Sequence, residues 1–234
     1  GCRARTGGAL SVVSTPRRLQ RIGLLGGSFD PVHVGHLAVA RAACRRFHLD
    51  EVHFIPAGRP PHKPRQELAP FPHRYAMVAL ACAENAHFVP SLAEAGADYS
   101  GRQPHYTIET VRRYRREYPH ARLYFIAGVD AFLEIPTWKE YERLLGLCDF
   151  IVASRPGYRL EALRLVIPPE LLGRTASPAR NVIALRHTAV HLLDTVASHV
   201  SATEIRRRRQ RRQSIHGLVP VRVEEYIVKL ALYT

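Results

Sequence analysis

The sequence predicts an α/β fold with a doubly wound parallel sheet, and three observations lead to this expectation. An apolar run at 22–25 is followed by glycines and an alanine-rich stretch, which is the order strand, tight loop, helix. A second strand-like run at 51–56 gives this unit the length of a βαβ crossover, and another strand that ends in glycine lies at 122–130. The 234 residues, of which 46% are hydrophobic, suffice for one substantial core, so we expect a single domain.

The other elements follow from helical periodicity, apolar runs and proline. Further helices are expected over 72–84, from 106 to near Pro119, from Ser201 onward and over 223–232. The last two form a C-terminal helical segment. Short strands are expected at 86–90, 92–99, 150–153, 181–185 and 190–193. Helical pieces and loop are expected in the proline-interrupted stretch 158–180.

Charge and cysteine content restrict the class of protein. Lysine and arginine (34) outnumber aspartate and glutamate (20), and the net charge of +14 favours an anionic partner, whether nucleotide, nucleic acid or membrane. The four cysteines include no Cys-x-x-Cys pair, so reduced thiols in a cytoplasmic protein are the simplest interpretation. Residues 1–20 lack the apolar segment of a signal peptide, and no stretch reaches the length of a membrane span. We therefore expect no membrane association, a disordered N-terminal extension at 1–20 and a folded domain over 21–234.

The first strand and its helix are joined by Gly26-Gly27-Ser28-Phe29-Asp30-Pro31-Val32-His33-Val34-Gly35-His36. In open α/β sheets ligands bind at the carboxyl ends of strands, and the amides in the first turn of the next helix are free to bind an anion. His33 and His36 are three residues apart, so both imidazoles can face one ligand, and Gly35 permits close approach. The loop predicts a phosphate site. A surface turn with incidental histidines and half of a zinc site are the alternatives.

A second phosphate element is expected near residue 201. Ser201 and Glu204 have the spacing of a capping box, which predicts that a helix begins at Ser201. The hydroxyls of Ser201 and Thr203, the first-turn amides and the Arg206 guanidinium together suit a triphosphate, although an ordinary capped helix would also explain the serine. The arginines at 206–209 and 211–212 favour nucleic acid by charge, but no aromatic residues are interleaved with them.

Polar residues also follow other strands. Lys63 belongs to the proline-rich loop 57–64, which suits either a phosphate-facing lid or a solvated basic loop. Asp130 follows the glycine that ends the strand at 122–128, so it is expected at the site. Trp138, the only tryptophan, lies in the next loop and could pack in the core or stack on an aromatic base.

The segment Gly-Gly-Ser-Phe-Asp-Pro-x-His-x-Gly-His at 26–36 resembles the signature of the HxGH nucleotidyltransferase superfamily, whose fold is Rossmann-like. Within it the chain is similar to the bacterial nicotinate-nucleotide adenylyltransferases. The similarity rests on Pro-Pro-His-Lys at 60–63, Tyr-Thr-Ile-Glu-Thr at 106–110, Gly-x-Asp and Ile-Pro-x-Trp within 128–138, and Ser-x-Thr-x-Ile-Arg at 201–206. Ala202 and Arg212 depart from the family pattern, which usually has a serine and a glycine there.

The resemblance implies that 21–234 is a nucleotidyltransferase domain that joins nicotinate mononucleotide to the AMP part of ATP in NAD biosynthesis. Mg²⁺ would arrive with ATP, with no metal site of the protein's own. The catalytic residues would be His33, His36, Lys63 and Arg206. ATP would bind Gly26, Gly27, Ser28, Phe29, Gly35, Gly128, Asp130, Ser201 and Thr203. Nicotinate mononucleotide would bind Thr107, Trp138 and Lys139.

Three rivals remain at this point. Nicotinamide mononucleotide or phosphopantetheine could replace the nicotinate acceptor, and a nucleic-acid-binding module would explain the charge but neither phosphate motif. Stacking on Trp138 would serve the acid and the amide alike. A preference for the acid would need donors for its carboxylate, and the loop amides around Thr107 and Lys139 are the candidates. The sequence leaves the oligomeric state open.

Overall fold

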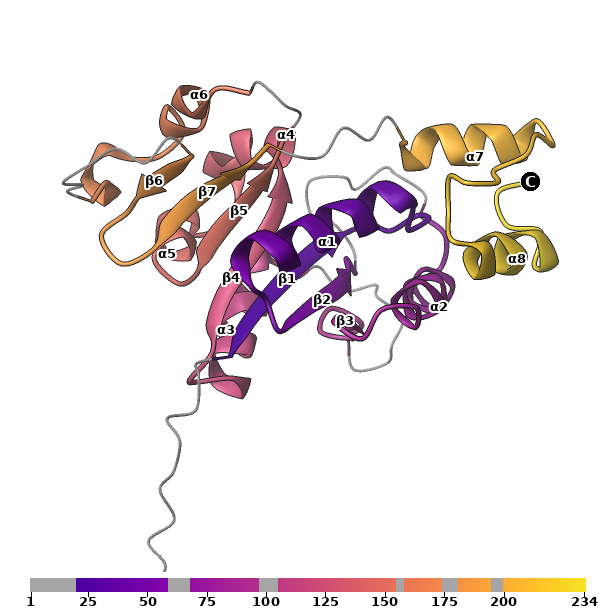
Figure 1. Cartoon of the computed structure of the whole chain (residues 1–234), viewed down its shortest axis with the longest axis horizontal. Coiled ribbons are helices and arrows are strands. Elements are labelled where there is room, and N and C mark those ends of the chain that lie inside the picture. Colours follow the sequence, from indigo (N-terminus) through magenta and orange to yellow (C-terminus); the bar gives the residue numbers. More distant parts are fainter. Residues whose placement is uncertain (1–19, 59–67, 97–104, 155–157, 174–180, 195–199) are drawn as a thin grey trace, which may run out of the picture.

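The computed structural model describes residues 20–58, 68–96, 105–154, 158–173, 181–194 and 200–234, and the structural statements below concern these residues. Its centre is a seven-stranded sheet with the strand order β3-β2-β1-β4-β5-β7-β6 (Figure 1). The strands are β1 (Arg21–Gly27), β2 (Glu51–Pro56), β3 (Phe88–Pro90), β4 (Arg122–Gly128), β5 (Asp149–Ala153), β6 (Val182–Ala184) and β7 (Ala189–Leu193). All neighbouring strands are parallel except β6 and β7. The expected doubly wound parallel sheet is confirmed except for the antiparallel pair β6–β7 at its edge.

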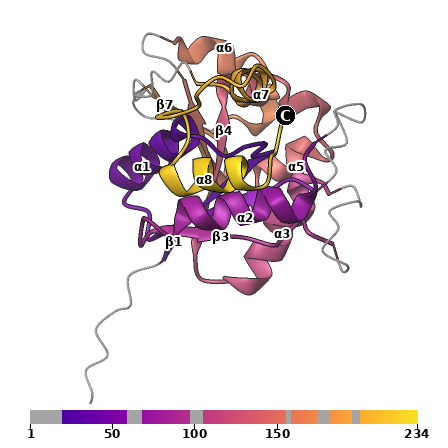
Figure 2. The ribbon, with the colours of Figure 1, turned by 90° about the vertical axis from the view of Figure 1, so that its right-hand side faces the viewer.

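Two groups of helices cover the two faces of this sheet. One face carries α1 (Val34–Phe47), α2 (Phe71–Cys82), α7 (Ala202–Gln210) and α8 (Val221–Lys229), whose apolar residues join one core cluster. The other face carries α3 (Thr107–Glu117), α4 (Val129–Leu133), α5 (Tyr141–Leu145) and α6 (Leu160–Arg164), which join a second cluster. Figure 2 shows α8 running beside α2, so the C-terminal helical segment packs on the first face.

The strand order determines where a ligand can enter. β1 lies between β2 and β4, so the chain leaves β1 toward one edge of the sheet and later returns to its other side. A crevice forms at such a reversal, outside the carboxyl ends of the strands. Close packing supports this centre: a Cβ added at Gly23 would lie 2.9 Å from Leu49 Cδ1, so β1 needs a glycine where the turn after α1 packs on it.

Most predicted elements are present, with boundaries that differ by a few residues, but the strand expected at 92–99 is wrong over its described part. The Ser91 amide donates to the Phe54 carbonyl, and the Ala95 amide then returns to the Leu92 carbonyl. The chain therefore turns away from the sheet edge after β3. Residues 97–99 lie outside the described ranges.

Two short helices, α4 and α5, were not predicted because five residues each are too few to show a helical repeat. The stretch expected to hold helical pieces contains α6 and a 3₁₀ turn at Pro169–Leu171. No helix within the described ranges is long and apolar enough to cross a membrane. Apart from Gln20, the predicted disordered extension lies outside these ranges, so it stays a prediction, as does the domain boundary at residue 21.

Candidate active site

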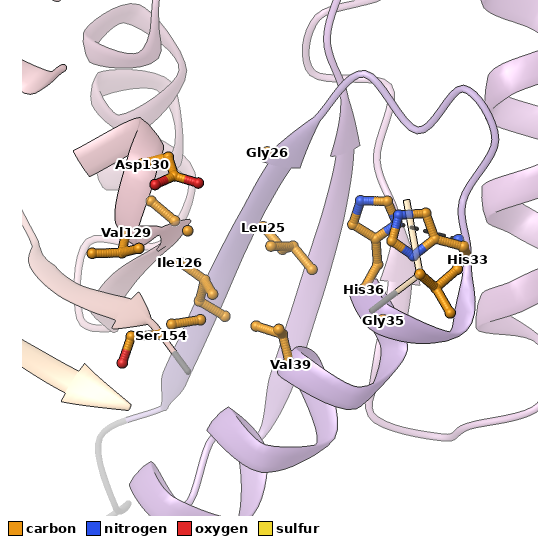
Figure 3. Close-up of a pocket in the computed structure, with 14 residues that line it drawn as sticks. Leu25, Gly26, His33, Gly35, His36, Val39, Ile126, Val129, Asp130 and Ser154 are labelled. Atoms are coloured by element: carbon orange, nitrogen blue, oxygen red, sulfur yellow. Dashed lines mark hydrogen bonds between the residues drawn. The ribbon is translucent and has the colours of Figure 1, made fainter. Parts of the chain in front are cut away.

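A pocket of about 360 Å³ opens at the carboxyl ends of β1, β4 and β5 (Figure 3). It brings together two groups of residues that were predicted to be catalytic or to bind ATP. Gly26, His33, Gly35 and His36 come from β1, α1 and the loop between them, and Gly128 and Asp130 come from the end of β4 and from α4. The remaining lining residues are Leu25, Val39, Ile126, Ala127, Val129, Ala153, Ser154 and Val200.

The two histidines form a fixed pair at the start of α1. Their rings stack with centroids 3.7 Å apart and planes 28° from parallel, as Figure 3 shows. The backbone amide of His33 donates to His36 Nδ1 at 3.2 Å. A neutral imidazole that accepts at Nδ1 carries its proton on Nε2. His36 therefore has Nε2–H as its donor for a ligand.

Burial keeps both imidazoles neutral in the free protein. It lowers the pKa of His33 from 6.5 to about 4. Burial, reinforced by the neighbouring His33, also lowers the pKa of His36 well below its ordinary value. A bound phosphate would act in the opposite direction, because a nearby negative charge favours the imidazolium. The pair can thus act as neutral hydrogen-bond donors or take up a proton when an anion binds.

Phe29 packs against His36, one member of the histidine pair. With φ at 46°, its backbone lies in the left-handed region, and its side chain is only 1% exposed. Its ring packs edge-on against His36, with centroids 4.9 Å apart, and against Phe54 at 5.7 Å. Contact of ATP with the Phe29 side chain is not available in this arrangement, and contact with its backbone stays a prediction.

The expectation of free amides at the start of α1 is wrong for two positions. The Val34 amide donates to the Leu218 carbonyl at 3.0 Å, and the His36 amide donates to the His33 carbonyl at 3.0 Å. The first bond comes from the segment before α8, which no local pattern could reveal. Anion binding at this helix start consequently depends more on the imidazoles than sequence reasoning assumed.

The helix predicted to begin at Ser201 forms, and its Arg206 contacts the loop that contains the two histidines. The Ser201 hydroxyl caps α7 by accepting from the Glu204 amide at 3.2 Å. Arg206 donates to the backbone carbonyl of Asp30 at 2.7 Å and lies 3.4 Å from the Thr203 hydroxyl. The Arg206 side chain is 21% exposed, so part of the guanidinium is still accessible. Arg206 therefore contacts the histidine loop, defined here as residues 26–36, although 176 positions separate it from Asp30.

Two supporting residues were missed by sequence reasoning. Arg74 is 2% exposed and donates to the carbonyls of Ser28, Ala57 and Ala69, at 2.8, 2.8 and 2.9 Å. It thus ties the loop after β1 to the end of β2. Its signal in the sequence is a charge on the apolar face of α2. Tyr233 donates to the buried Asp30 carboxylate at 2.7 Å, and no sequence pattern marks this contact.

Two of the residues expected to bind the mononucleotide, Thr107 and Lys139, lie around the start of α3 and outside this pocket. Lys139 Nζ pairs with Glu109 at 2.7 Å and lies 4.2 Å from the Tyr106 ring centroid, next to Thr107 in the chain. Trp138 is half-buried and packs edge-on against Phe125 at 5.9 Å. Thr107 and Lys139 are thus brought together, while none of the three predicted residues lines the pocket of Figure 3.

Two expectations stay predictions: the catalytic role of Lys63, and Mg²⁺ that arrives with ATP and not at a metal site of the protein's own. Lys63 lies outside the described residues, so its part in the site stays a prediction. Among the described residues, no group of three or more His, Cys, Asp or Glu side chains could hold a metal ion. Gly27 and Ser28 act through their backbone in this structure, since their carbonyls accept from the Ala57 amide and from Arg74.

Comparison with known proteins agrees with this geometry. The family model described as cytidylyltransferase-like matches residues 24–208. A probable nicotinate-nucleotide adenylyltransferase of Moorella thermoacetica is 43% identical, over 91% of this chain and 91% of its own. One of Thermus thermophilus is 40% identical, over 91% and 99% of the two chains.

Solved structures agree in fold. The nicotinic acid mononucleotide adenylyltransferase of Plasmodium falciparum complexed with NaAD has a TM-score of 0.69 at 19% identity, covering 92% of this chain and 97% of its own. The identity of the bacterial relatives and their nearly complete coverage carry more weight than this likeness. The chain belongs to the nicotinate-nucleotide adenylyltransferases, within the cytidylyltransferase-like family.

Proposed function

We propose that the protein transfers the adenylyl group of MgATP to nicotinate mononucleotide. The 5′-phosphate oxygen of the mononucleotide attacks the α-phosphorus of ATP, a new P–O bond forms, and the bond to the β-phosphate breaks. The products are nicotinate adenine dinucleotide and pyrophosphate. Because a phosphate monoester is largely ionised at neutral pH, the attacking group needs no general base.

The observation that carries this proposal is the joined arrangement of the histidine pair and Arg206 at one end of the sheet. His36 offers Nε2–H, and Arg206 offers a guanidinium that is held at Asp30 but partly exposed. These donors suit the charge that develops on the phosphates during in-line transfer. Lys63 would add a further cation from its loop. Mg²⁺ enters as part of the nucleotide substrate, and we infer that the reaction takes place in the cytoplasm.

In this proposal, ATP and the acceptor occupy different parts of the crevice. The triphosphate would lie over the start of α1, between His36 and Arg206. Gly128 leaves room near the end of β4, because a Cβ built there meets nothing within 4 Å. The pyridine ring would lie toward Trp138, with the loop amides near Thr107 and Lys139 serving its carboxylate.

An acceptor panel tests the proposal. The purified protein is incubated with ATP, Mg²⁺ and one acceptor at a time: nicotinate mononucleotide, nicotinamide mononucleotide or phosphopantetheine. Pyrophosphate release is measured, and the adenylylated product is identified by mass. We expect the highest catalytic efficiency with nicotinate mononucleotide. Release with phosphopantetheine alone, or with no acceptor, would exclude the proposed function.

A further inference from the structure

The C-terminal end of the chain returns to the histidine loop. Tyr233, the penultimate residue, donates its hydroxyl to Asp30 Oδ1 at 2.7 Å, and 203 positions separate the two residues. Figure 1 places the C-terminus next to α7 and α8. The Asp30 side chain is 1% exposed and Tyr233 is half-buried, so the tyrosine hydroxyl reaches a buried carboxylate.

Asp30 is also the docking point of Arg206. The arginine donates to the backbone carbonyl of Asp30 at 2.7 Å, while its Nη1 lies 3.9 Å from Asp30 Oδ2. That oxygen is buried and has no hydrogen-bond partner among the described residues. Asp30 Oδ1, by contrast, accepts from Tyr233 and, at 3.3 Å, from the Ala69 amide. The carboxylate is therefore satisfied on one side only.

This arrangement makes the carboxylate a competitor for Arg206. A buried carboxylate with an open lone pair favours the strongest donor within reach, and charge-assisted bonds to guanidinium are among the strongest. Arg74 is buried nearby and interacts electrostatically with Asp30, but its N–H groups are already bonded to the carbonyls of Ser28, Ala57 and Ala69. Arg206 is consequently the cation that Asp30 would draw in if it lost a donor.

We propose that Tyr233 is a positioning residue for adenylyl transfer, acting through Asp30 to leave the Arg206 guanidinium available to the triphosphate. The phenol satisfies Oδ1 of the buried carboxylate and so weakens its pull on Arg206, which bonds the Asp30 carbonyl and keeps N–H groups for a phosphate. This inference rests on the proposed function. It adds that Tyr233, which is far in sequence from the histidine loop, affects how tightly ATP is bound.

The test compares two tyrosine variants that each lose one hydroxyl from the C-terminal segment. Tyr233→Phe removes the donor to Asp30. Tyr226→Phe is the matched control, because the Tyr226 hydroxyl bonds His73 Nδ1 at 2.9 Å and does not contact Asp30. Steady-state kinetics with each substrate varied in turn, and thermal unfolding, are measured for both variants and the wild type.

We expect Tyr233→Phe to raise the KM for ATP about tenfold, the effect of one weakened charge-assisted contact, while the KM for the mononucleotide changes less than about twofold. Tyr226→Phe should leave both KM values near those of the wild type, even if the two variants lose similar thermal stability. An unchanged ATP KM in Tyr233→Phe, or the same rise in both variants, overturns the inference.

A second variant tests the competition itself. Asp30→Asn keeps an oxygen that can accept from Tyr233 but carries no charge with which to draw Arg206 away. In the Asp30→Asn background, we therefore expect Tyr233→Phe to raise the ATP KM by less than about threefold, a loss of additivity that marks coupled residues. A full tenfold rise in that background contradicts the mechanism. A wild-type protein without adenylyl transfer would instead refute the proposed function, so the two failures are distinguishable.

Discussion

The histidine end of the site, formed by residues 26–36 with Arg206, is held by buried contacts, whereas the tryptophan end, formed by Thr107, Trp138 and Lys139, combines a half-buried tryptophan with an exposed ion pair. Phe29 and Asp30 are each 1% exposed. The Lys139–Glu109 pair, in contrast, joins side chains that are 42% and 46% exposed, and solvent screening makes such pairs weak. The difference indicates that the groups proposed for chemistry are preorganised, while those proposed for acceptor recognition can adjust.

The most damaging change should be at the histidine end. We expect His36→Ala to lower kcat by about 10²-fold or more, because it removes a donor aimed at the charge that develops in the transition state. Thermal stability should change little by comparison. His216→Ala is the control, since His216 is exposed and pairs only with Glu224 among the described residues. Near-normal turnover in His36→Ala would remove this histidine from the mechanism.

Arg206 should be separable from its arginine neighbours. Arg206→Ala should lower kcat/KM for ATP by about 10- to 100-fold, as expected for a lost charge-assisted contact. Arg207 and Arg208 pair with Glu204 instead. Replacing the five neighbours with glutamine should therefore leave adenylyl transfer mostly intact; these are Arg207, Arg208, Arg209, Arg211 and Arg212. A loss as large as that of Arg206→Ala would place the whole basic run in the site.

At the tryptophan end, smaller effects on both acceptors are expected. The wild type should prefer nicotinate over nicotinamide mononucleotide by about 10²-fold in kcat/KM. A backbone N–H that donates to the carboxylate of nicotinate would face the NH₂ group of nicotinamide, which is a donor and leaves that N–H unpaired. Trp138→Ala should weaken both acceptors by up to about tenfold and keep most of their ratio, since stacking does not distinguish them.

Steady-state assays with both mononucleotides check this division of roles. Equal efficiency of the two in the wild type would exclude selection of the acid. A ratio that collapses in Trp138→Ala would show that the indole itself discriminates.

The last effect concerns the dependence of stability on pH at the histidine end. The pKa of His33 is about 4 in the folded protein and 6.5 in the unfolded chain, so the unfolded state binds more protons between these values. The free energy of unfolding is therefore highest above pH 6.5, where His33 is neutral in both states, and it decreases as the pH falls toward 4. Urea unfolding should therefore show a fall on the order of 1 to 3 kcal/mol over this range from His33 alone.

His33→Gln should flatten that dependence, and Trp138→Ala should not. An identical pH dependence in the wild type and in His33→Gln would mean that His33 is not buried as a neutral imidazole.

Local patterns predicted the parts of the site that local sequence builds. The glycine-rich loop and its histidines lie on consecutive residues, and the Ser201 cap is set by its spacing to Glu204. The bonds from Val34 to Leu218 and from Tyr233 to Asp30 depend instead on how the C-terminal helices fold back, which no short pattern encodes. The strand expected at 92–99 was wrong because β3 ends at Pro90 and the chain then turns, with the Ala95 amide donating to the Leu92 carbonyl.

The most direct test of the central claim, attack on the α-phosphorus of ATP at the histidine end, follows the α-phosphate with a label. ATP labelled at that phosphorus is incubated with Mg²⁺ and nicotinate mononucleotide, and the products of the wild type and of His36→Ala are separated. We predict one labelled dinucleotide for each unlabelled pyrophosphate released by the wild type, and almost no product from His36→Ala. Label in free AMP or in pyrophosphate, or undiminished dinucleotide formation by His36→Ala, would contradict the account.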